Sequence, residues 1–203
     1  MSEHLNIAAW LGKRPVARDK RNLLMFAFRE FGDVLGAPSE ILILGTKDRI
    51  ETHGSWDIDS ALLERRLASD ELLFVYGTLE GSTAGARGSV CIDEADKKAS
   101  ITISLPEENL ARGECEIGHM CQLLCSELLT LSFPSTVIAG WEVELPETAR
   151  SAREILRTAF IQTPKIEWLA TSFAEPSGIP GFQESAAKDG VVVFRRKATV
   201  AGH

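Results

Sequence analysis

No stretch of this chain is apolar for long enough to cross a bilayer as a helix. The N-terminal residues 1–14 contain the acidic Glu3 and only a short apolar run, which is not typical of a secretory signal. The chain has only four cysteines, and three of them fall in one segment with helical periodicity, which argues against a disulfide framework. We therefore expect a cytoplasmic protein with reduced thiols and no membrane partner.

The motifs of common nucleotide-binding and hydrolytic sites are also missing. The sequence has no P-loop, no dinucleotide-binding fingerprint and no Gly-x-Ser-x-Gly elbow. The glycine-rich stretch 77–88 lies between two strand-like segments and has neither a Lys-Ser/Thr ending nor a helix behind it to receive phosphate. This stretch is therefore interpreted as a connector.

The best metal-ligand candidates are Cys115, His119, Cys121 and Cys125. All four lie along one predicted helix, and four ligands on one straight helix cannot converge on a single ion. Cys121 and Cys125 also lie on or beside the apolar stripe of that helix, where a free cysteine packs as a small hydrophobic residue. We assign no metal-binding, cofactor-binding or catalytic residue.

The charge balance points to the kind of partner. With 29 Asp and Glu against 22 Lys and Arg, the formal net charge is −7, whereas binding to a phosphate backbone relies on clustered cations. An acidic surface instead suits a basic protein partner, because opposite charges accelerate the encounter. We expect no direct contact with nucleic acid.

Helical and strand-like patterns interleave without repeats or a long linker, and the hydrophobic content of 44% is enough for a core. Helices are predicted within 16–36, 55–70, 113–134 and 148–158. Strands are predicted at 5–11, 40–45 and 71–81, twice within 86–106, at 135–146, around Trp168 and at 190–198. We therefore expect a single α+β domain over residues 1–203. It should have a mixed, largely antiparallel sheet and about four packing helices, with residues 198–203 as a flexible tail.

The order of these elements carries a family resemblance. An opening strand ends in aromatic-x-Gly-x-Arg and leads into a long amphipathic helix, and a later strand reads SITISLP. The C-terminal block then combines a Trp-containing strand, a Pro-rich connection and Asp-Gly before VVVF. The residues concerned are Trp10, Gly12, Arg14, Pro164, Trp168, Pro180, Asp189 and Gly190. This layout resembles the bacterial polymorphic-toxin immunity proteins of immunity protein family fifty-two.

The resemblance implies an antidote encoded beside its toxin, which is often delivered by a type VI secretion system. Toxins paired with this family commonly carry a restriction-endonuclease-like nuclease domain. The family is thought to act by binding, so the resemblance implies no catalytic residues and no enzyme activity. The expected function is neutralisation of the cognate toxin by occlusion.

The residues themselves suggest where such a partner would bind. A nuclease holds phosphates on a basic surface, which carboxylates can cover while aromatic rings anchor the complex. Segment 164–182 combines both residue types, and on a strand over 135–146 two glutamates would point away from Trp141 and Val143. The partner-binding candidates are Glu142, Glu144, Glu167, Trp168, Phe173, Glu175 and Phe182.

Other interpretations stay open. Trp168 and Phe173 lie an odd number of residues apart, so on a regular strand one of them would pack in the core. A small-molecule enzyme could use a site near Arg14, His53 and Asp57, in a deep pocket with converging polar groups. A scaffold or oligomeric adaptor would instead present a large apolar, self-complementary face.

Overall fold

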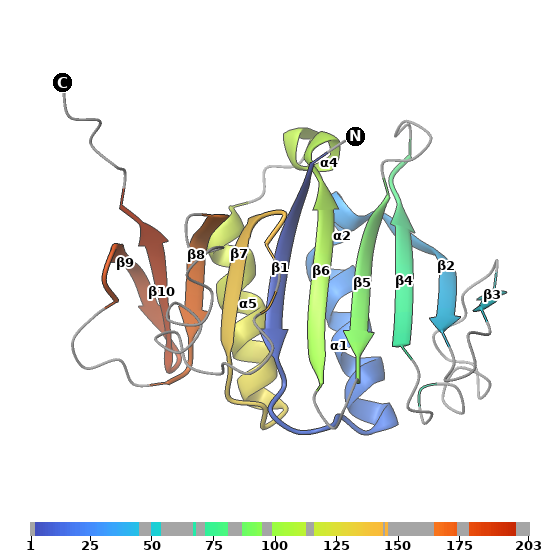
Figure 1. Ribbon diagram of the computed structural model, residues 1–203, viewed down its shortest axis with the longest axis horizontal. Helices are drawn as coiled ribbons and strands as arrows, with labels where there is room; N and C mark the ends of the chain where they lie inside the picture. The colour runs from blue at the N-terminus through green and yellow to red at the C-terminus, as the bar shows by residue number, and fades with distance from the viewer. Residues whose placement is uncertain are drawn as a thin grey trace.

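The computed structural model describes residues 3–44, 50–53, 67, 72–80, 87–94, 99–112, 116–143, 145, 165–173 and 179–197. Its strands are β1 (His4–Trp10), β2 (Ala37–Leu44), β3 (Ile50–His53), β4 (Leu72–Thr78), β5 (Gly88–Asp93), β6 (Ser100–Pro106), β7 (Thr136–Trp141), β8 (Ile166–Thr171), β9 (Phe182–Lys188) and β10 (Val191–Arg196). They form one sheet in the order β3-β2-β4-β5-β6-β1-β7-β8-β10-β9, and each neighbouring pair is antiparallel (Figure 1).

The described helices are α1 (Ala17–Glu30), α2 (Gly32–Leu35), α4 (Glu107–Arg112) and α5 (Ile117–Thr130). Figure 1 shows α1, α2 and α5 on one face of the sheet, with α4 at the end where β1 begins. Helix α5 contacts β7, β8 and β10, whereas α1 contacts β5 and α2 contacts both β4 and β5. These helices and the antiparallel sheet confirm the predicted α+β fold. None of the described helices has the length and apolar character of a membrane span.

Two hydrophobic clusters lie on opposite faces of the sheet. The larger one lies between the sheet and the helices and includes Leu24 of α1, Leu124 of α5 and Ile103 of β6. The smaller one covers the other face of β1, β7, β8 and β10, where Ile138 and Leu169 are buried. Since successive strand residues point to opposite faces, β7 and β8 are buried on both sides.

Several element boundaries differ from the sequence prediction. The helix expected within 16–36 is divided at Phe31, whose φ of −115° and ψ of 16° separate α1 from α2. The strand expected at 135–146 ends at Trp141, because Glu142 adopts a left-handed φ of 49°. Strands β3 and β9 and helix α4 were not predicted. The helix predicted at 148–158, most of the one at 55–70 and the tail 198–203 lie outside the described residues.

Candidate partner-binding surface

Glu142 lies in a turn and not on the outward face of a strand, which corrects the prediction. Its backbone N–H donates to the carbonyl oxygen of His4 over 2.9 Å, and its Oε1 accepts a hydrogen bond of 2.7 Å from the His4 backbone N–H. The side chain is exposed, while the following Val143 is buried. Glu142 therefore sits beside the beginning of β1, at the end of the sheet.

Two further glutamates lie at the same end of the sheet. The backbone N–H of Glu107, the first residue of α4, donates to the carbonyl oxygen of Glu3 over 3.1 Å. Glu3, Glu107 and Glu142 are all exposed. They meet here because β1 pairs with both β6 and β7, so the start of β1, the end of β6 and the end of β7 coincide (Figure 1). We call these three residues the acidic end.

Basic residues lie both beside the acidic end and at the opposite end of β1. Nζ of Lys165 lies 3.5 Å from the backbone oxygen of Glu142, so one cation adjoins the acidic end. Lys13 and Arg14 follow β1 at its other end, and both are exposed. The carboxylates of the acidic end therefore adjoin the cation of Lys165 at the beginning of β1, whereas the charged residues that directly follow its other end, Lys13 and Arg14, are basic.

The rings of Trp168 and Phe182 lie in the hydrophobic clusters, which corrects the prediction that they form a contact surface. Trp168 is only 8% exposed, and the guanidinium of Arg195 lies 5.1 Å from its ring centroid. Phe182 is 4% exposed, with the Arg196 guanidinium 4.8 Å from its ring. The ring of Trp168 on β8 and the ring of Phe182 on β9 are both buried, so neither ring offers an aromatic anchor to a partner.

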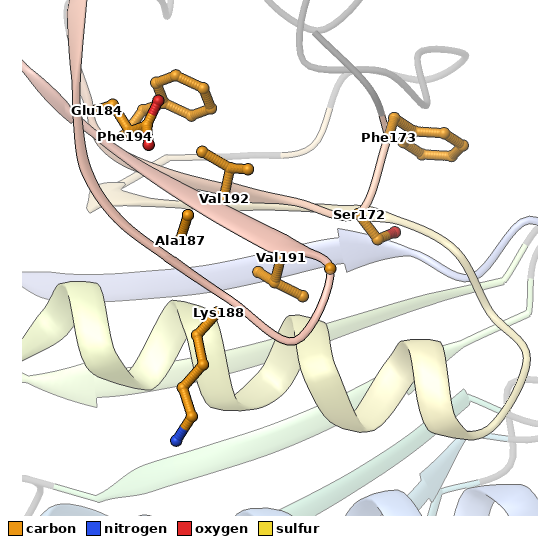
Figure 2. A pocket seen from close by; sticks show the side chains of 9 residues that line it. Ser172, Phe173, Glu184, Ala187, Lys188, Val191, Val192 and Phe194 are labelled. Carbon is orange, nitrogen blue, oxygen red and sulfur yellow. The ribbon is translucent and has the colours of Figure 1, made fainter.

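Phe173 has a different environment from the other two rings. It is half-buried just after β8 and borders an open cavity of about 320 Å³ next to the β9–β10 hairpin (Figure 2). We call this cavity the hairpin hollow. It is lined by Ser172, Phe173, Glu184, Ala187, Lys188, Gly190, Val191, Val192 and Phe194. Trp168, Phe173 and Phe182 are the three aromatic residues predicted to contact a partner. Of these, Phe173 is the one whose ring borders a surface depression.

The carboxylates predicted near these rings are only partly described. Glu167 is half-buried on β8 and lies close to Arg196. Burial lowers the pKa of the Arg196 guanidinium from its ordinary value, and the nearby Glu167 carboxylate opposes that change. Nε of Arg196 also donates to the backbone oxygen of Ile166 over 2.6 Å. Glu144 and Glu175 lie outside the described residues, and the described part of this region carries mixed charge.

The described metal-ligand candidates, His119, Cys121 and Cys125, do not converge on one point. His119 is exposed on α5, whereas Cys121 and Cys125 are buried in the larger cluster, and Cys115 lies outside the described residues. Burial raises the pKa of the Cys125 thiol to about 12 and raises that of Cys121 as well, so both thiols are protonated at neutral pH. Within the described ranges, no three His, Cys, Asp or Glu side chains are grouped to hold a metal ion.

Arg14 and His53, the two described residues of the alternative enzyme site, are not brought together. Arg14 follows β1, while His53 ends β3 at the far edge of the sheet. Four strands, β2, β4, β5 and β6, lie between β3 and β1, which at ordinary strand spacing is a separation on the order of 20 Å. Asp57 lies outside the described residues.

Two features of this surface were missed at the sequence level. Glu3 and Glu107 are far apart in the sequence, and only the pairing of β1 with β6 brings them together. Strand β9 has no alternating pattern, although the Asp189-Gly190 dipeptide before an apolar run is a hairpin signal that could have indicated it. Comparison with family models, curated proteins and solved structures gives no match to this chain.

Proposed function

We propose that this chain is an immunity protein that binds a secreted bacterial toxin, a nuclease with a basic substrate-binding surface, and neutralises it by occlusion. The observation that carries this proposal is the acidic end. Glu3, Glu107 and Glu142 come from separate segments, and all three are exposed at one end of the sheet. The resemblance noted from the sequence supplies the biological setting, including a toxin encoded beside this gene and delivered by a type VI secretion system.

Electrostatics explains why carboxylates suit this role. A nuclease must attract phosphate groups with Lys and Arg, so its working surface is positively charged. A protein with net charge −7 is drawn to that surface, and steering of this kind raises association rates at low salt. A stable complex of this type buries on the order of 1,600 Å² in total, which is enough to cover a substrate-binding cleft.

The hairpin hollow supports the proposal with a contact of a different kind. Phe173, Val192 and Phe194 present apolar surface beside the exposed strand β9. The hollow lies at the end of the sheet where β1 finishes, away from the acidic end, so it would be a second contact area for a partner that spans the sheet. The second candidate function, a small-molecule enzyme near Arg14 and His53, lacks such support because these residues lie on well-separated strands.

The direct test uses the protein encoded by the neighbouring gene. We expect the purified chain to form a one-to-one complex with that protein, measured by titration calorimetry. We also expect cells that produce the neighbouring protein to survive when they produce this chain. If the two purified proteins do not bind and the cells are not protected, the proposal is wrong.

Charge reversal tests the acidic end. We expect the double variant Glu107→Lys/Glu142→Lys to associate about tenfold more slowly with the neighbouring protein at low salt, because it replaces attraction with repulsion. The association rate should also depend less steeply on salt. The matched control is Glu30→Lys/Asp33→Lys, which makes the same change in net charge at exposed residues of α1 and α2. If stopped-flow measurements give equal association rates for the two double variants, the acidic end is not part of the interface.

A further inference from the structure

Strand β9 is a free edge of the described sheet. It is the last strand in the order, beyond β10, and from Gln183 to Lys188 every residue is exposed (Figure 1). An edge strand presents a row of backbone N–H and C=O groups that can pair with another extended chain. The chemistry of such an edge specifies its ligand, which is a peptide segment in β conformation.

The hairpin turn shows which backbone groups point outward. Lys188 and Val191 pair across the two-residue turn Asp189-Gly190, whose φ angles of 52° and 79° are typical of a type I′ turn. In such a hairpin the two residues that close the turn, Lys188 and Val191, exchange backbone hydrogen bonds with each other. The next pair, Ala187 and Val192, does not. The backbone N–H and C=O of Ala187 therefore point away from β10, toward the open edge.

The side chains in the middle of β9 leave this edge accessible. Ser185, Ala186 and Ala187 are small, whereas natural edge strands are commonly protected by charged residues or proline. The charged residues Glu184 and Lys188 flank these three positions, and the register shifts opposite them between Val193 and Phe194. Such an irregularity blunts an edge, so a further strand would pair with the regular part beside the turn, which includes Ala187.

The hairpin hollow lies on one face of this edge. The charged side chain that Figure 2 shows on that face is the carboxylate of Glu184. Figure 2 shows Glu184, Val192 and Phe194 on the side of the hollow, while the Lys188 side chain extends toward α5 on the other side. A strand added along β9 would point alternate side chains to the face of the hollow. A lysine or arginine there could lay its aliphatic stem over Ala187 and place its cation near Glu184.

We propose that the free edge of β9 accepts an extended segment of the toxin as a further strand, with a lysine or arginine of that segment lying over Ala187 toward Glu184. This inference rests on the proposed function, because it names how the basic partner is held. Backbone pairing would supply affinity, and the Glu184 carboxylate together with the hollow would select the side chain.

The test removes the outward N–H of Ala187 without breaking the hairpin. Ala187→Pro eliminates that donor, and proline is tolerated on edge strands where the N–H faces solvent. We expect this variant to bind the protein encoded by the neighbouring gene about tenfold more weakly, while Ala187→Ser, which keeps the N–H, binds as the unmodified chain does. Thermal unfolding of both variants should match that of the unmodified chain, which shows that the hairpin is intact.

A second pair of variants tests the charge. We expect Glu184→Lys to weaken binding about tenfold, whereas Glu30→Lys, which makes the same change of charge at an exposed residue of α1, leaves it unchanged. In the unmodified chain, hydrogen exchange at the Ala187 amide should slow by at least tenfold when the neighbouring protein binds, as expected for an amide that enters a strand pair.

The outcomes separate this inference from the proposed function. If the neighbouring protein binds Ala187→Pro as tightly as the unmodified chain and leaves exchange at Ala187 unchanged, the edge is not its site, although the inhibitor role stands. If the neighbouring protein does not bind at all, both proposals are wrong. If sedimentation reveals a dimer that Ala187→Pro converts to a monomer, the edge is occupied by a second copy of this chain and the inference is overturned.

Discussion

Replacing Gly36 with alanine is expected to lower the free energy of unfolding by roughly 3 kcal/mol or more, since backbone strain and steric overlap add at this position. Gly36 joins α2 to β2 with φ 80° and ψ −178°, a combination that is essentially restricted to glycine. A Cβ atom there would also lie 2.3 Å from the carbonyl carbon of Thr78. The backbone of β4 would have to move away, and β4 pairs with both β2 and β5.

Gly181 provides a matched control for this substitution. It has nearly the same φ, 81°, but a Cβ atom there would meet nothing within 4 Å. Gly181→Ala therefore measures the conformational cost with little steric cost, and we expect it to be the milder of the two substitutions. Urea unfolding of both variants gives the comparison. Equal losses of stability would show that the close approach of Gly36 to Thr78 does not constrain the fold.

The elements with one buried face could be predicted from the sequence. In β6, Ile101, Ile103 and Leu105 are buried while Thr102 and Ser104 are half-buried, so the strand has the alternation that the sequence displays. Helix α5 likewise buries Met120, Leu124 and Leu128 along one stripe. Where only one side of an element meets the core, its apolar period is the period of the secondary structure.

Strand β9 could not be predicted from such a pattern, since exposure on both faces removes the alternation. Its sequence FQESAAK is poor in the β-branched and aromatic residues that favour strands. The strand exists because the Asp189-Gly190 turn reverses the chain and β10 supplies its pairing partner. Tertiary context therefore overrides a weak local preference.

The candidate surface was predictable only in part, for a related reason. Glu142 was assigned to a strand face, but its left-handed φ ends β7 and turns the chain. Trp168 was assigned to the surface, but Gly118 of α5 leaves room for its ring, because a Cβ atom at that glycine would lie 2.5 Å from it. The acidic end depends on β1 lying between β6 and β7, and one sequence does not reveal strand order.

A buried ion pair gives the other large expected effect. Lys20 of α1 and Glu94, which follows β5, have side chains only 5% and 2% exposed, and Nζ lies 2.9 Å from Oε1. Within the described part of the chain, this Oε1 accepts no hydrogen bond of regular geometry. Among the described residues, the positive charge of Lys20 therefore offsets the energetic cost of burying the Glu94 carboxylate.

We expect Lys20→Met to lower the free energy of unfolding by about 3–5 kcal/mol, because it leaves the Glu94 carboxylate buried without this cation. The double variant Lys20→Met/Glu94→Leu should recover most of that loss, since two apolar side chains of similar volume need no compensating charge. Urea unfolding of the single and double variants forms a double-mutant cycle that isolates the coupling energy. A double variant no more stable than Lys20→Met alone would show that α1 is held against the sheet by packing, and that the ion pair contributes little to the fold.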